Sequence, residues 1–320
     1  MPNDKKIVKQ IPDEQPGPSG GEILNEGQQE SVEQILKKFV PDKYRKMGNL
    51  EVLRELQKLE NNLAAESGRK PYQVRGAGSS AETIGLADKE RQTLNVKLSY
   101  NPYGVLHTLL HESRHASQYE LIQERKRAVG NHQLMGDYKK NVEKHGLTDK
   151  DLLVMSWETD NYSNNDTNQY HMQFVEADAE ISSYKFLVKH KGLLGGNGQF
   201  DLVIQQLENK MNDLKDAFND DEMVKNWSKD RQTRHGNTGQ GGLSQEEQRR
   251  LGEIYASGNI KQGGFSVIKD INSFERKKWV TGVTLEELLG LDTQRPIQRE
   301  KVKEEAHAET KLKREMHRNL

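Results

Sequence analysis

Residues 109–116, Leu-Leu-His-Glu-Ser-Arg-His-Ala, lie at the centre of the segment that decides how this chain folds. Upstream, Leu94, Val96, Leu98 and Tyr100 alternate with polar residues. This period of two predicts a strand over 93–100 with one buried face, ended by residues 101–102, Asn-Pro. From residue 103 onward the apolar residues recur every three or four positions, which predicts a long helix. The quoted stretch is therefore expected on a helix that follows a strand and a tight turn.

The spacing of the two histidines on that helix favours a metal site. His111 and His115 are four residues apart, so a helix places both imidazoles on one face, where a single zinc ion can bind them. Glu112 follows His111 directly, and its carboxylate can reach a water on the metal without displacing it. The alternative is a polar helix face with two unrelated histidines. We expect His111 and His115 as zinc ligands and Glu112 as the catalytic base.

A catalytic zinc site needs a third protein ligand, and residues 173–180, Gln-Phe-Val-Glu-Ala-Asp-Ala-Glu, are the best source. Glu176 and Glu180 are one helical turn apart on a helix expected over about 169–190. We expect Glu176 to bind the metal and Glu180 to accept a hydrogen bond from the far nitrogen of a ligating histidine. Asp178 or Glu180 as the ligand, or a solvated acidic helix face, are the alternatives.

Four further side chains are candidates for contacts with a substrate. His107 lies one turn before His111, but a helix drifts by about 40° over each such step, so one ion is not expected to bind three histidines of this series. His107 is therefore expected beside the metal or in the substrate cleft. Tyr162, Tyr170 and His171 are candidates to donate a hydrogen bond to a developing oxyanion, with a structural role as the alternative for each.

Composition limits the classes of function. The 320 residues include 48 basic and 49 acidic ones, a net charge of −1, so no overall field attracts nucleic acid or anionic membranes. The chain has no cysteine, which excludes disulfides and thiolate ligands and leaves His, Asp and Glu to bind metal. No segment approaches the ~20 apolar residues of a membrane span, and none resembles a signal peptide. We expect synthesis in the cytoplasm without a cleavable signal peptide; export by a signal-independent secretion system stays open.

The strand, the His-Glu-x-x-His helix and the downstream acidic helix together resemble the zincin metallopeptidases with a glutamate third ligand. A narrower resemblance is to metallopeptidase domains of bacterial polymorphic toxins and secreted effectors. It rests on His-Ala-Ser-Gln at 115–118, Trp157, Asn-Tyr at 161–162 and residues 173–179, and Phe174 stands where that family commonly has proline. The likeness covers about residues 80–190. It implies the ligand set His111, His115 and Glu176, with Glu112 as the base and Glu180 behind the ligands.

The expected fold class is α+β and predominantly helical, with a small sheet, a zincin-like catalytic domain and helical flanks. Low apolar content, 32% against 30% charged residues, predicts that part of the chain is solvated. Periodicity and composition predict a disordered leader at 1–30, a helical hairpin packing on the core at 31–68 and the zincin-like domain at 69–230. A linker at 231–243, a small accessory helical region at 244–295 and a charged tail at 296–320 are expected to follow.

Smaller features complete this organisation. Residues 130–165 are polar and rich in glycine and are expected to form a loop with short helices, and a helix is expected near 200–218. Ser244 with Glu247, and Thr284 with Glu287, match capping boxes that begin helices. The stretch from Arg231 to Arg250 is basic, but it contains acidic residues and no aromatic side chain, so we expect a solvated linker and no nucleic-acid partner.

These expectations converge on a zinc metallopeptidase, a hydrolase with one Zn²⁺ ion, whose substrate is a protein or peptide. The strand at 93–100 is expected at the cleft edge, where an extended substrate can pair with it. A role as a secreted toxin or effector, with an immunity protein or secretion partner, follows from the resemblance alone. Two rival functions stay open: a zincin-fold binding or effector protein with a structural zinc, and a zinc amidase acting on peptidoglycan.

Overall fold

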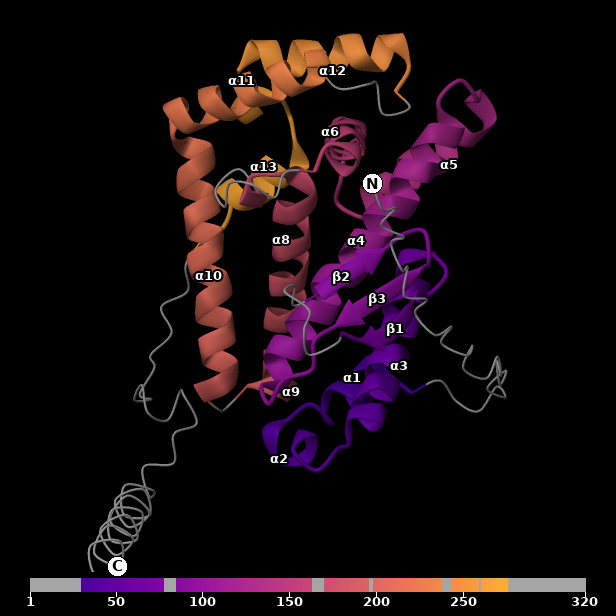
Figure 1. Cartoon of the computed structure of the whole chain (residues 1–320), viewed down its shortest axis with the longest axis vertical. Helices are drawn as coiled ribbons and strands as arrows, with labels where there is room; N and C mark the ends of the chain where they lie inside the picture. The colour runs from indigo at the N-terminus through magenta and orange to yellow at the C-terminus, as the bar shows by residue number, and fades with distance from the viewer. Residues whose placement is uncertain are drawn as a thin grey trace, which may run out of the picture. The chain divides into compact units, whose positions relative to one another are not determined.

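The computed structural model describes residues 30–77, 85–162, 170–195, 198–237, 243–258 and 260–275. The chain divides into two units, Met1–Glu30 and Ser31–Leu320. The second unit is predominantly helical with one small mixed sheet, which confirms the α+β class (Figure 1). The leader expected over 1–30, except for Glu30, the tail over 296–320 and the capping box at Thr284 lie outside the described residues.

Three helices, not a hairpin of two, form the first part of the second unit. They are α1 (Val32–Leu36), α2 (Pro41–Tyr44) and α3 (Asn49–Ser67). The expected hairpin is wrong because Pro41 begins a separate one-turn helix, as a proline at the first helical position favours. In α3, Leu56 and Leu59 are buried, whereas Leu50 from the same pattern is 73% exposed.

The sheet has three short strands, β1 (Gln73–Gly76), β2 (Gly85–Asp88) and β3 (Thr93–Val96), in the order β1-β3-β2. β3 pairs in parallel with β1 and antiparallel with β2. The expected strand over 93–100 is correct only as far as Val96, and Tyr100 is almost fully exposed. Its expected place at the cleft edge is wrong, because β3 has a partner on both sides and no residue of 93–100 lines the cavity beside His111 and Glu112. β2 is the edge strand beside the cleft.

The helix α4 (Pro102–Ala128) confirms the long helix predicted around residues 109–116. Asn101 caps it, since its side chain accepts hydrogen bonds from the backbone N–H groups of Tyr103 and Gly104, and Pro102 occupies the first turn. The helix packs against β2 and β3 and against α8 (Phe174–Lys189), the second long helix that the sequence predicted (Figure 1). The short helix α9 (Lys191–Leu194) follows α8.

Two regular helices, α5 (His132–Lys144) and α6 (Asp149–Asp160), replace the loop expected over 130–165. The expected short helices are present, but they are longer than expected and leave little loop, because strong local caps begin both of them. Asn131 caps α5, and Thr148 forms a capping box with Asp151 at the start of α6. The apolar residues 152–155 of α6 are fully buried, so tertiary packing also stabilises this helix.

The remaining helices are α10 (Gly198–Asn219), α11 (Asp221–Asn237), α12 (Gln245–Ser257), the 3-10 turn Ile260–Gln262 and α13 (Ser266–Asn272). α10 confirms the helix expected near 200–218, and the capping box of Ser244 with Glu247 is present. The solvated linker expected from residue 231 is wrong at its start. Arg231 lies inside α11, fully buried beside the rings of Trp157 and Trp227.

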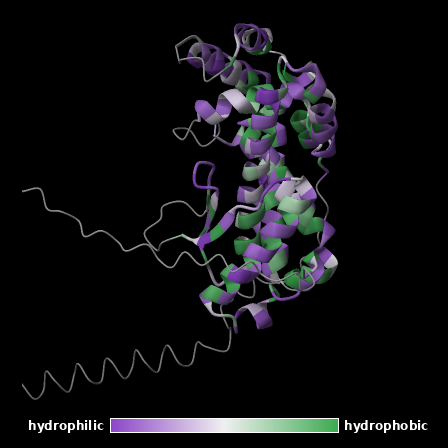
Figure 2. Ribbon diagram, turned by 90° about the vertical axis from the view of Figure 1, so that its right-hand side faces the viewer, coloured by the Kyte–Doolittle hydropathy of each residue, from purple (hydrophilic) through white to green (hydrophobic). Residues whose placement is uncertain are grey.

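Buried apolar side chains form two clusters. One joins the sheet and α1–α3 to the first half of α4 and to parts of α8 and α10, and the other joins α5, α6 and α11–α13 to the remaining parts of α4, α8 and α10. Apolar and polar residues alternate along most of these helices (Figure 2). No helix in the described parts of the chain is long and apolar enough to cross a membrane.

Candidate metal centre

The packing of α4 against α8 brings His111, His115 and Glu176 together. The Nε2 atoms of the two histidines are 3.0 Å apart. From Glu176, Oε2 lies 3.3 Å from Nε2 of His111, and Oε1 lies 3.2 Å from Nε2 of His115. All three side chains are almost fully buried. The sequence therefore predicted correctly which residues lie together, although the histidines and the glutamate are about sixty positions apart.

This triangle of atoms has the size that a zinc ion requires. Tetrahedral ligands at bond lengths of 2.0–2.2 Å are separated from one another by about 3.3–3.5 Å. The separations of 3.0–3.3 Å, from each histidine Nε2 to the other and to the nearer of the two Glu176 oxygens, are at or slightly below this range. Two imidazole nitrogens and a carboxylate are typical zinc ligands. The residues present thus fit one zinc ion with three protein ligands.

Charge interactions within the triangle are strong. Burial lowers the pKa of His115, but the adjacent Glu176 carboxylate outweighs burial and raises it to about 9. Burial alone would raise the pKa of Glu176, and the two histidines instead hold it well below its usual value. Glu176 is therefore ionised, and it offers the negative charge that a buried divalent cation needs.

Glu112 lies beside the triangle and faces the same cavity. Burial raises the pKa of its carboxyl group, and the neighbouring His115 and His111 partly offset this. The edge strand approaches closely at Gly85: a β-carbon there would lie 2.5 Å from Oε1 of Glu112 and 2.6 Å from Cγ2 of Thr108. Contacts with β2 on one side thus limit the positions that the Glu112 carboxylate can take.

A cavity of about 530 Å³ opens above the triangle, between β2, α4, the end of α6 and the start of α8. Its walls include all four predicted catalytic and ligand residues and the rings of Tyr119, Tyr162 and Tyr170. The Tyr162 hydroxyl donates a hydrogen bond to Oε1 of Glu176. Burial and the Glu176 charge raise the pKa of Tyr162 and of Tyr170, so both phenols stay protonated and can act as donors.

Glu180 lies behind the ligands, close to where the sequence placed it. Its Oε1 is 3.6 Å from Nδ1 of His111, which is longer than a hydrogen bond. His107 makes the closer contact, with Nε2 3.0 Å from Oε2 of Glu180, and the ammonium group of Lys210 pairs with Oε1. His107, His111 and Glu180 would suit a second metal ion, but the Lys210 charge already neutralises this carboxylate.

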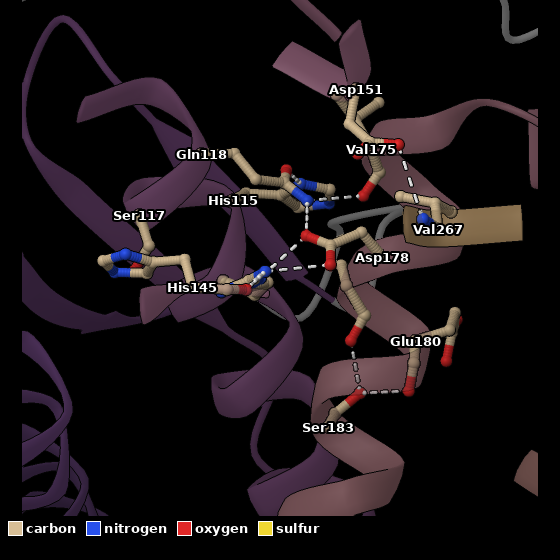
Figure 3. A network of polar contacts seen from close by, with 12 residues as sticks. His115, Ser117, Gln118, His145, Asp151, Val175, Asp178, Glu180, Ser183 and Val267 are labelled. Carbon is tan, nitrogen blue, oxygen red and sulfur yellow. Dashed lines mark hydrogen bonds and ion pairs between the residues drawn. The ribbon is translucent and has the colours of Figure 1, made fainter. Parts of the chain in front are cut away.

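Gln118 and Asp178 fix the orientation of His115 (Figure 3). Nδ1 of His115 lies 2.8 Å from Oε1 of Gln118, and the amide nitrogen of Gln118 donates to Oδ2 of Asp178 at 2.7 Å and to the Val175 carbonyl at 2.9 Å. Because both partners of that nitrogen are acceptors, the amide must present its oxygen to His115. His115 therefore donates from Nδ1 to Gln118, which leaves Nε2 on the side of Glu176 and His111.

Asp178 is not placed to bind the metal. Its two carboxylate oxygens accept hydrogen bonds from Arg114, from Nε at 2.7 Å and from Nη2 at 2.9 Å. Arg114 also donates to the His145 carbonyl oxygen at 2.9 Å. Of the three acidic residues weighed as the third ligand, the structure therefore brings Glu176 to the histidine pair and engages Asp178 and Glu180 elsewhere.

Glu158 of α6 supports the start of α8, which carries Glu176. The first turn of α8 has no side-chain cap of its own, and Oε2 of Glu158 accepts a hydrogen bond from the Val175 N–H at 3.3 Å. Burial raises the pKa of Glu158 to about 7, although Arg231 and the backbone N–H groups of α8 lower it. The position of the third ligand thus depends on a buried side chain from another helix.

No protein-family model, curated protein or solved structure matches this chain. The geometry is therefore the basis for assigning a function. Of the four residues predicted to contact substrate, Tyr162 and Tyr170 line the cavity, whereas His107 and His171 do not. His107 instead lines a neighbouring cavity beside Lys210.

The sequence did not indicate that Gly85 and Ala87 lie beside Glu112. It also gave no role to Gln118, and it did not predict the structural role of Asp178. The spacing of Gln118 from His115, three residues on a helix, is a local signal that could have indicated their contact. Gly85 gave no comparable signal, because its closeness to Glu112 depends on how β2 packs across α4.

Proposed function

We propose that this chain is a zinc-dependent peptidase of the zincin type, with His111, His115 and Glu176 as the ligands. The observation that carries the proposal is the cluster of three buried side chains, His111, His115 and Glu176, with Glu112 beside it, facing an open cavity. A structural zinc site is closed by four protein ligands, whereas a catalytic one leaves a place for water. Three protein ligands below a cavity of about 530 Å³ favour the catalytic type.

A bound zinc ion would supply a Lewis acid that polarises a carbonyl and lowers the pKa of a water molecule. Glu112 would take a proton from a water molecule whose oxygen adds to the peptide carbonyl carbon, and would give that proton to the amine nitrogen as the C–N bond breaks. Its raised pKa suits this exchange, because a base that later acts as an acid works best with a pKa near the operating pH. Tyr170 supplies a hydroxyl donor for an oxyanion in the same cavity, and Tyr162, whose hydroxyl donates to Glu176, would have to turn from that carboxylate to act in the same way.

The substrate is proposed to be an extended polypeptide that lies along β2. This strand is the edge of the sheet, and residues 85–87 line the cavity beside Glu112. An edge strand offers unpaired N–H and C=O groups that an extended chain can pair with. Such pairing recognises backbone conformation, so it favours flexible or unfolded segments of proteins as substrates. The resemblance to toxin and effector domains adds the proposal that the target is a protein of another cell.

The test uses the full chain, loaded with zinc, and its variant Glu112→Gln. The amide keeps the shape of the side chain but cannot accept a proton, so turnover of a flexible protein substrate should fall by about 10²–10⁴-fold. Zinc content should stay at one ion per chain. Glu120→Gln, the same change two turns later on α4, is the matched control and should retain full activity.

New peptide termini in a target-cell lysate should appear with the unmodified chain and be missing with the Glu112 variant. A purified peptidoglycan substrate, added in parallel, decides between a peptidase and a cell-wall amidase. Full activity of the Glu112→Gln variant on proteins would refute the proposed base. Stoichiometric zinc without activity on either substrate would favour the rival with a structural zinc.

A further inference from the structure

A second cavity lies on the face of α4 that points away from the metal centre. Its volume is about 440 Å³, within the range of small-molecule sites. Helices α3, α4 and α8 and the end of α5 enclose it, and four residues of α4 line it: Leu110, Ser113, Arg114 and Ser117. Within the His-Glu-Ser-Arg-His motif, Ser113 and Arg114 therefore face this cavity. The other three residues, His111, Glu112 and His115, face the metal centre.

The walls of this cavity carry an excess of positive charge. Four cationic side chains line it, Arg114, Lys144, Lys185 and Lys189, against one carboxylate, that of Glu66. Asp178 and Asp270 neutralise Arg114 and Lys185. Lys144 and Lys189 have no acidic side chain within ion-pair distance in the parts of the chain that the structure describes, and Nζ of Lys144 donates to the Glu66 backbone carbonyl at 2.7 Å.

The pKa of His145, which also lines the cavity, reflects this positive charge. Burial lowers the pKa of His145, and the charges of Arg114 and Lys144 lower it further. Arg114 donates from Nε and Nη2, and its third nitrogen, Nη1, makes no hydrogen bond to another described residue. A guanidinium group with a free nitrogen beside two unmatched ammonium groups is a suitable binding site for a phosphate group.

The other lining residues indicate a ligand with an organic part. Ser67 and Ser182 add hydroxyl groups near the cations, and Leu63, Leu110 and Phe186 form an apolar wall. We propose that this cavity binds a small organic phosphate, with the phosphate between Arg114, Lys144 and Lys189 and the organic part against Phe186. We include in the proposal that Arg114 couples this site to the metal centre.

The coupling follows a continuous chain of contacts. Arg114 donates to both oxygens of Asp178. Asp178 accepts from the amide of Gln118, and the Gln118 oxygen faces Nδ1 of His115 (Figure 3). A phosphate that draws Arg114 towards the cavity weakens its hold on Asp178, and this changes the orientation of the His115 ring. The coupling rests on the proposed zinc site, whereas the binding of a phosphate does not.

Calorimetric titration of the zinc-free full chain with phenyl phosphate tests the site itself. Saturable binding is expected, and it should be tighter than that of inorganic sulfate, which lacks the ring. The double variant Lys144→Gln/Lys189→Gln should bind phenyl phosphate at least tenfold more weakly. Its matched control, Lys139→Gln/Lys140→Gln, removes the same charge from positions of α5 that are likewise exposed but do not line the cavity, and it should bind normally.

Two results would overturn the site. One is the absence of saturation below about 10 mM phenyl phosphate. The other is equal weakening in both double variants, which would show a diffuse attraction to surface charge that added salt screens.

The coupling has its own test, the zinc dissociation constant with and without saturating phenyl phosphate. Linkage requires that zinc changes the affinity for phenyl phosphate by the same factor by which phenyl phosphate changes the affinity for zinc. The effect should disappear in Lys144→Gln/Lys189→Gln, which excludes direct binding of the phosphate to the metal. A zinc affinity that phenyl phosphate leaves unchanged would overturn the coupling. If the protein binds phenyl phosphate but does not bind zinc, the metal centre is refuted and the phosphate site is not.

Discussion

Gly85 of β2 lies directly against the Glu112 carboxylate, so closely that an added β-carbon would meet Oε1 at 2.5 Å. The substitution Gly85→Ala should therefore displace the proposed base while leaving the ligand triangle in place. A misplacement of about 1 Å near a reacting group costs on the order of 10²-fold in rate, and we expect a loss of this size in kcat. Steady-state kinetics and zinc titration together measure it.

Gly76→Ala is the control for that substitution. Gly76 belongs to the same sheet, but a β-carbon there would meet Cδ1 of Leu53 at 3.6 Å, an ordinary contact. Its activity should equal that of the unmodified chain. If Gly85→Ala retained full kcat, the contact with β2 would not position Glu112.

Glu176→Ala should weaken zinc binding more than any change behind the ligands. Loss of a ligand removes a metal bond and a buried negative charge, so the zinc dissociation constant should rise by more than the ~10- to 100-fold typical of an outer contact. Asp178→Asn and Glu180→Gln should each stay within that smaller range. A larger loss in either of these two than in Glu176→Ala would move the third ligand to that position.

Gln118→Met should lower zinc affinity by about 10- to 100-fold, because Nδ1 of His115 loses the acceptor that fixes its ring and its tautomer. Competition with a chromogenic chelator measures the change. Gln123→Met, at an exposed position of α4, is the matched control. The melting temperatures of the zinc-free variants show whether the substitution destabilises the fold. If Gln118 only positions His115, the zinc-free variants should melt at the same temperature as the unmodified chain, and only their zinc affinity should differ.

Glu158 should make stability depend on pH near neutrality. Its pKa in the folded chain, about 7, lies above the ordinary value of 4.5, so folding favours the protonated carboxyl group. The stability that this group contributes is greatest below pH 4.5 and is lost as the pH rises through about 7. Glu158→Gln removes this dependence and should be more stable than the unmodified chain at pH 8, by on the order of 2 kcal/mol.

Urea unfolding at pH 5 and pH 8 measures that difference. At pH 5 the two chains should be nearly equal, since the unmodified carboxyl group is then protonated in the folded state. A variant that is less stable at pH 8 would show that the charge of Glu158, held by Arg231 and the start of α8, stabilises the fold.

The centre of the fold and of the site could be predicted from the sequence because the signals there are local. His111, Glu112 and His115 sit on one helix, and the helical period that surrounds them is long and regular. The place of Glu176 beside the two histidines was also predictable, because the glutamates of α8 are embedded in a buried helix. Such local patterns fix which side chains share a face, and these are the features that the structure confirms.

The features that the sequence did not predict depend on contacts between distant segments. Nothing near residues 94–96 shows that β1 and β2 pair on both sides of β3, so the edge strand was assigned wrongly. Polar residues in α5 and α6 suggested a loop, although caps at Asn131 and Thr148 and burial against the rest of the core stabilise helices. Arg231 appeared to be a linker residue because its aromatic neighbour Trp157 is 74 positions away in the sequence.

The proposed ligands also lie where the two apolar clusters meet, since α4 and α8 are shared by both. A divalent ion held by His111 and His115 of α4 and by Glu176 of α8 would cross-link these two helices. Loss of the ion would then loosen both halves of the fold at once, and chelation should increase cleavage by added trypsin at sites remote from the centre as well as near it. Metal supply would in this way set how long the protein survives in the presence of proteases.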